Sequence, residues 1–117
     1  MKIKTADLIG PALDWAVAKC EGLNSVAACY LNGEGQLMYL EEASWPTWEP
    51  STNWSQGGPI IEQELLCVNP DTPRNQWMAI TNSAEIVQFG PTALIAAMRC
   101  FVASRLGDEV DVPDELV

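Results

Sequence analysis

The sequence predicts an α+β fold in which an antiparallel sheet of two hairpins is flanked by helices, as an α/β/α sandwich. Two pairs of β-prone runs, each joined by a short turn, predict the antiparallel sheet. Two apolar helical patterns, one near each end of the chain, supply the covering layers. No repeat or linker interrupts the 117 residues, so we expect a single domain over 1–117.

The N-terminal part begins with a short edge strand at 2–4, whose lysines discourage edge pairing, and a helical turn at 5–8 capped by Thr5. A helix over 12–21 follows, with Pro11 suited to its first position and Gly22 to its end. One apolar stripe at helical spacing supports it: Leu13, Ala16, Val17 and Cys20.

The first hairpin is expected to pair 26–31 with 36–40 across a turn with two glycines. The second pairs 76–81 with 84–89 across a tight turn at 82–83. Alternating apolar and polar residues in 76–81 place Trp77 and Ala79 on one face of that strand, as expected for a sheet with one packed side.

Between the hairpins, 59–68 has features of both a helix, which we favour, and a strand. Pro59 suits a helix start, whereas the apolar residues at either end suit a strand. The strongest helix covers 93–106, with Thr92 as its N-cap and Gly107 after its end. The acidic tail at 108–117 is expected to pack back loosely.

Residues 44–62 form the most unusual stretch of the chain, with three of the five tryptophans and three of the eight prolines. Pro46 and Pro50 prevent a regular helix or central strand through its first half. Indole rings can stack on bases, and Gly57 and Gly58 allow close approach of a ligand or another backbone. Packing over the sheet, a ligand site and a protein interface all remain open for this stretch.

A second candidate feature is the helix start at Thr92, because free N–H groups and the helix dipole attract phosphate there. Arg99, seven residues into that helix, could pair with an anion or with Glu62 or Glu64. The full set of candidate ligand-binding residues is Trp45, Trp48, Ser51, Thr52, Trp54, Gly57, Gly58, Thr92 and Arg99.

The sequence lacks the common catalytic motifs. The chain has no histidine, which removes Ser-His and Cys-His dyads, and no phosphate-binding or dinucleotide-binding glycine motif. Four widely spaced cysteines without a Cys-x-x-Cys pair do not indicate a zinc site, and we expect reduced thiols that are mostly buried. We therefore expect no catalytic residues, no metal and no cofactor.

A net charge of −10, from 16 acidic and 6 basic residues, repels DNA and RNA duplexes and anionic membranes. No apolar run approaches the roughly 20 residues that cross a bilayer, and the N-terminus lacks a signal-peptide core. A cytoplasmic protein that binds neither duplex nor membrane is expected.

The chain resembles the NinX family of small proteins from lambdoid phages and prophages. The resemblance is carried by Leu13-Asp-Trp-Ala-Val-Ala-Lys, by residues 50–62, and by Gly90-Pro-Thr-Ala-Leu-Ile-Ala-Ala-Met-Arg-Cys with Leu106-Gly107 and Val112-Pro113. Ala93 stands where the family pattern often has proline. A more distant similarity to phage ABA-sandwich domains agrees with the predicted fold. The resemblance implies an accessory protein acting in the cytoplasm of the infected bacterium.

Two function hypotheses follow. The first is a non-catalytic protein that binds a small nucleotide-like ligand, for example to sequester a host immune signal, with bases stacked on tryptophan and phosphate near Thr92. The alternative is a protein-interaction module that inhibits a host or phage protein. Exposed tryptophans would also suit a homo-dimer or a higher homo-oligomer.

Overall fold

A computed structural model describes residues 1–21, 29–31, 37–39 and 48–117. Its helices are α1 (Gly10–Cys20), α2 (Trp54–Glu64) and α3 (Ala93–Leu106). Its strands are β1 (Lys2–Lys4), β2 (Cys29–Leu31), β3 (Leu37–Tyr39), β4 (Cys67–Asp71), β5 (Gln76–Ile80), β6 (Val87–Gly90) and β7 (Glu109–Asp111). The predicted α+β class is confirmed.

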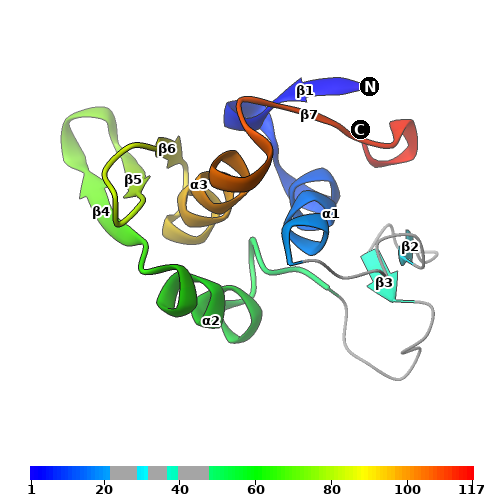
Figure 1. Ribbon diagram of the computed structural model, residues 1–117, viewed down its shortest axis with the longest axis horizontal. Helices are drawn as coiled ribbons and strands as arrows, with labels where there is room; N and C mark the ends of the chain where they lie inside the picture. Colours follow the sequence, from blue (N-terminus) through cyan, green and yellow to red (C-terminus); the bar gives the residue numbers. More distant parts are fainter. Residues whose placement is uncertain (22–28, 32–36, 40–47) are drawn as a thin grey trace.

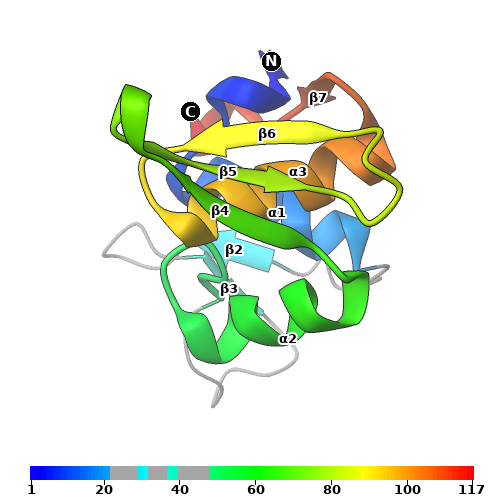
Figure 2. The same ribbon diagram turned by 90° about the vertical axis from the view of Figure 1, so that its left-hand side faces the viewer.

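The order of the layers differs from a helix–sheet–helix sandwich. The largest sheet has the antiparallel order β4-β5-β6, and α3 lies between this sheet and α1 (Figure 1). Figure 2 shows the sheet toward the viewer with α3 and α1 behind it, while α2 lies beside the β4 edge. Both α1 and α3 therefore lie on one side of the sheet, and its other face is left to solvent in the described part of the chain.

The two predicted hairpins both form, but they do not share a sheet. Within the described residues, β2 pairs only with β3, beside α1, and β5 pairs with β6. The third strand of the main sheet is β4, which begins within the stretch for which we favoured a helix. Because β4 connects to β5 through one short turn, it occupies the edge of β5 that the first hairpin would have needed.

Helix α3 is the centre of the core, and its predicted bounds, N-cap and end are confirmed. Nine of its 14 residues are buried, on all sides of the helix, so it is packed by neighbours all round rather than along one stripe. Thr92 Oγ1 accepts a hydrogen bond from the Ile95 N–H at 3.1 Å. Gly107 follows the last turn with a φ of 86°, which favours glycine.

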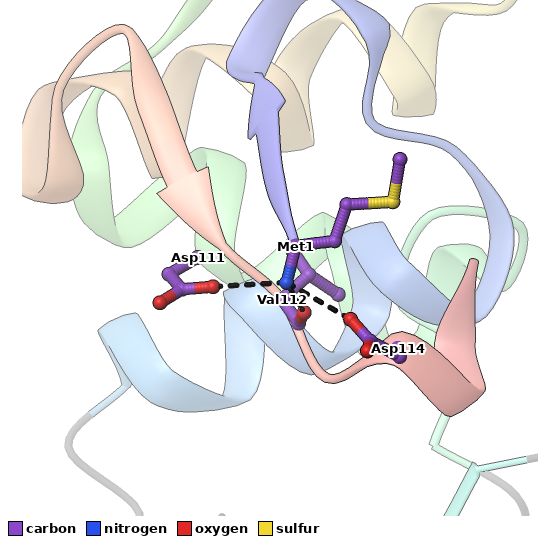
Figure 3. A network of polar contacts seen from close by, with 4 residues as sticks. All are labelled: Met1, Asp111, Val112 and Asp114. Carbon is purple, nitrogen blue, oxygen red and sulfur yellow. Dashed lines mark hydrogen bonds and ion pairs between the residues drawn. The ribbon is translucent and has the colours of Figure 1, made fainter.

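Both ends of the chain are held by specific contacts. The predicted strand β1 pairs with β7, so the acidic tail is part of a small sheet instead of packing loosely. Thr5 does not cap the following turn; it is fully buried and its hydroxyl donates to the Gly107 carbonyl at 2.6 Å. The Met1 ammonium group contacts Asp111, Val112 and Asp114 at 2.8–3.1 Å (Figure 3).

Helix α2 starts five residues earlier than Pro59, the predicted start. Asn53 caps it, since its side chain accepts from the Ser55 N–H at 2.9 Å. Pro59 lies inside the helix, where its missing N–H would have bonded to the Ser55 carbonyl. Ser55 and Pro59 are both exposed, so water can satisfy that carbonyl. The helix ends at Leu65 in the left-handed conformation, which turns the chain into β4.

The segment before α2 is fastened to α1 through Asp14. The Ser51 N–H donates to Asp14 Oδ1 and the Trp48 indole N–H donates to the Asp14 carbonyl, both at 2.9 Å. Burial raises the pKa of the Asp14 carboxyl to about 6, and contacts with Ser51 oppose this shift only in part. The Ser51 hydroxyl is near enough to lower that pKa, although it forms no hydrogen bond in the described structure.

The two adjacent glycines of α2 should respond differently to alanine. A Cβ at Gly57 would collide with the Pro50 carbonyl oxygen and the Leu94 side chain, whereas a Cβ at Gly58 would meet only the Trp54 ring at 3.9 Å. We expect Gly57→Ala to lower the free energy of unfolding by about 1–3 kcal/mol. Gly58→Ala should leave it unchanged or raise it by up to ~1 kcal/mol. Urea denaturation of both variants tests this, and equal effects would contradict the close packing of α2.

Asp14 predicts a pH-dependent stability. Since its folded-state pKa is raised above the ordinary value, the folded protein binds this proton more tightly than the unfolded chain. The free energy of unfolding should therefore fall as pH rises from about 4 to about 6, by at most about 3 kcal/mol. Asp14→Asn retains an acceptor for the Ser51 N–H but cannot ionise. Denaturation of both proteins across this pH range should show a difference that changes with pH; a constant difference would contradict the assignment.

Candidate functional site

A largely apolar hollow in the described surface lies where α2, α3 and the sheet meet. We call it the Trp54–Trp77 pocket; it has a volume of about 350 Å³, within the range of small-molecule sites, and is partly open. Its lining residues are Ser51, Thr52, Trp54, Trp77, Pro91, Thr92, Ala93, Leu94 and Ile95. It therefore brings together four predicted site residues from two segments that are about 40 positions apart in the sequence.

Two indole rings from different elements line this pocket. Trp54 is the first residue of α2 and is 58% exposed, unusual for so large an apolar side chain. Trp77 lies in β5 and packs partly against the core. Its register partner is Gly90, which has no side chain and is followed directly by the segment that starts α3. The rings thus present apolar surface near one helix start.

That helix start has unused hydrogen-bond donors. Thr92 accepts the Ile95 N–H through its side chain and the Ala96 N–H through its carbonyl. The N–H groups of Ala93 and Leu94 have no partner among the described residues, and both residues line the pocket. The pocket therefore combines aromatic walls with the positive end of a helix dipole.

Two glycines allow the close packing that forms the pocket. A Cβ at Gly90 would lie 2.7 Å from the Ala96 nitrogen, so glycine lets the end of β6 approach the first turn of α3. Gly57 plays the same part for α2, which approaches Leu94 and Pro50. As a result, Gly57 is buried and the space beside it is filled by protein atoms rather than being open to a ligand.

Other predicted site residues lie outside the pocket or beneath its wall. Trp48 is half-buried against α1, where it helps to fasten the segment before α2. Ser51 lines the pocket, but its hydroxyl oxygen is shielded from solvent. Gly58 lies beside the Trp54 ring. Trp45 is outside the described residues.

Arg99 lies in a second depression, which we call the Arg74–Arg99 groove. Its residues are Ala6, Arg74, Asn75, Gln76, Gln88, Phe89, Gly90, Pro91 and Arg99. Arg99 pairs with neither Glu62 nor Glu64: its Nε and one terminal nitrogen donate to the Leu8 and Phe89 carbonyls, each at 2.8 Å. Glu64 instead pairs with Arg105 at 2.7 Å. Pro91 lines both depressions, so they adjoin at the Gly90–Thr92 turn.

Trp77 is the residue that the sequence reasoning missed. The alternating pattern predicts its strand face correctly, but its cross-strand partner in β6 depends on the hairpin register. The predicted turn at 82–83 would pair Trp77 with Gln88, away from Thr92, whereas the observed partner is Gly90. The turn is longer because the Thr81 N–H donates to the Ile86 carbonyl and Ala84 takes a left-handed conformation.

The described thiols and carboxylates give the pocket no reactive group. Burial raises the pKa of Cys20 to about 12 and that of Cys100 to about 11, so both are poor nucleophiles. Cys67 is exposed, contrary to the expectation that thiols are mostly buried, but it does not line the pocket. In the described part of the chain, no group of three metal-ligating side chains occurs and no helix is suited to crossing a membrane.

Comparison with known proteins identifies the family. No curated protein matches the chain significantly. The family described as bacteriophage P22 NinX matches residues 4–105, which cover α1, α2, all but the last residue of α3 and strands β2 to β6, as well as the residues that form the pocket and the groove. The chain therefore belongs to the NinX family of phage proteins.

Proposed function

We propose that this phage accessory protein binds a small nucleotide-like ligand in the Trp54–Trp77 pocket and performs no catalysis. The observation that carries the proposal is the exposed Trp54 ring in one pocket with Trp77 and the unpaired N–H groups at the start of α3. Aromatic rings stack with any base, which contributes ~1–3 kcal/mol per base in single-strand binders.

The start of α3 supplies the polar half of the proposed site. A phosphate at this end would accept hydrogen bonds from the Ala93 and Leu94 N–H groups and would gain from the helix dipole. The pocket residues include no carboxylate, thiol or imidazole that could act as a nucleophile or general base. This composition supports binding without chemistry. In the cytoplasm of an infected bacterium, such binding would suit the sequestration of a host immune signal.

A variant of Trp54 tests the proposal. A panel of mono-, di- and cyclic nucleotides should include at least one that raises the melting temperature of the wild-type protein. Trp54→Ala should weaken that nucleotide about 5- to 150-fold, which corresponds to the loss of one stacking contact. Leu65→Ala is the matched control, because it removes a similarly exposed apolar side chain, 63% against 58%, just past the other end of α2. Equal weakening in both variants, or no shift with any nucleotide, would refute the proposal.

The alternative, a protein-interaction module, is favoured by a different surface. The outer face of the main sheet carries Val87 and Phe89, which are 39% and 37% exposed, beside the half-buried Met78 and Ile80. An uncovered apolar face of this kind suits a host protein or a second copy of the chain. If no nucleotide binds and a pull-down from host lysate recovers a specific protein, this alternative replaces the ligand proposal; a mass that rises with concentration in light scattering would instead assign the face to a second copy of the chain.

A further inference from the structure

The Arg74–Arg99 groove stands out from the charge distribution of the molecule. The chain carries 16 acidic and 6 basic residues, yet two of the basic residues line this groove and none of its lining residues is acidic. Its other polar side chains include the amide of Gln88, which can donate a hydrogen bond, and that of Gln76, which already donates to Asp71. The groove is therefore a local exception in a strongly acidic protein, and it offers donors to an anion.

Arg99 is a half-buried cation whose hydrogen-bond partners are neutral. Its two bonds go to backbone carbonyls, and no carboxylate in the described residues lies within ion-pairing distance of 4.0 Å. Burial lowers its pKa, and the more distant Asp7 opposes that shift. A partly desolvated charge without a counter-ion is unfavourable. An anion bound beside Arg99 would therefore offset the desolvation free energy of its guanidinium.

Arg74 can contact a ligand in the groove at a small cost in free energy. It is 71% exposed and pairs with Asp71 at 3.2 Å, while Gln76 donates to the same carboxylate at 3.0 Å. The Asp71 side chain is only 12% exposed, but the Arg74 guanidinium faces solvent, which weakens the ion pair. Because Gln76 would still satisfy Asp71, Arg74 can turn toward a ligand in the groove.

The neighbouring Trp54–Trp77 pocket lacks the positive charge that the groove provides. None of its lining residues is basic, so a polyanionic ligand held there would meet the field of a chain with net charge −10. The two depressions share Pro91 and flank the same turn before α3. A ligand that spans Pro91 would contact both depressions.

We propose that the Arg74–Arg99 groove binds a second phosphate of the ligand whose base lies in the Trp54–Trp77 pocket, so that the preferred ligand is a nucleotide with at least two phosphates. This inference rests on the proposed function and makes its ligand class specific. The first phosphate lies at the start of α3, and the second is held by the charge-assisted donors of Arg74 and Arg99.

Calorimetric titration with AMP, ADP and pyrophosphate tests this assignment. The wild-type protein should bind ADP at least about tenfold more tightly than AMP, the value of one charge-assisted contact. Arg74→Ala should abolish most of this preference and leave AMP affinity unchanged. Arg105→Ala is the matched control, since it removes the same charge from an ion pair with Glu64 outside the groove. Arg99→Lys, if its melting temperature is unchanged, should reduce the preference as Arg74→Ala does.

Three results would overturn the assignment: equal affinity of the wild-type protein for AMP and ADP, equal weakening of ADP by Arg74→Ala and Arg105→Ala, and no binding of pyrophosphate. Pyrophosphate separates the two proposals because it has no base. It should lose affinity in Arg74→Ala and keep it in Trp54→Ala. Binding of pyrophosphate in this pattern, without binding of AMP or ADP, would overturn the nucleotide function and with it the shared ligand, while still locating an anion site in the groove.

Discussion

The burial of α3 on every side is the constraint on which the rest of the structure depends. Seven of its residues have at most 3% of their surface exposed, and the helix contacts α1, α2, the main sheet and both ends of the chain. Small residues make this possible: Ala96 and Ala97 are fully buried, and Gly90 admits the end of β6 against the first turn. A helix enclosed in this way has few free surfaces, and its N-terminal end is one of them.

The candidate site follows from that enclosure. Gly57 brings α2 against Leu94, and Gly90 brings β6 against Ala96, so two elements converge on the start of α3. Asp14 fixes the segment that leads into α2, although its buried carboxyl lowers stability at neutral pH. The ionised Asp14 carboxylate in α1 thus lowers the free energy of unfolding, while its hydrogen bond holds the segment that presents Trp54. The same turn, Gly90–Thr92, separates an aromatic pocket from a basic groove.

Local signals in the sequence predicted α3 fully, because Thr92, the apolar run and Gly107 all agree on its bounds. They also predicted that Trp54 and Thr92 belong to the candidate site. They failed where tertiary packing decides: α2 continues through Pro59 because its buried side holds Gly57 and Ile60, and β4 follows from the left-handed turn at Leu65. Trp77 was missed because its position depends on a turn two residues longer than the sequence suggested.

The central claim is that the start of α3 is a ligand site with aromatic walls. An NMR titration of the ¹⁵N-labelled protein with ADP examines it directly, through the indole N–H signals of Trp54 and Trp77 and the amide signals of Ala93 and Leu94. The account predicts that these four signals shift together and saturate with one dissociation constant, while the signals of the outer sheet face at Val87 and Phe89 stay in place. Shifts confined to that outer face, or no shifts at the start of α3, would contradict it.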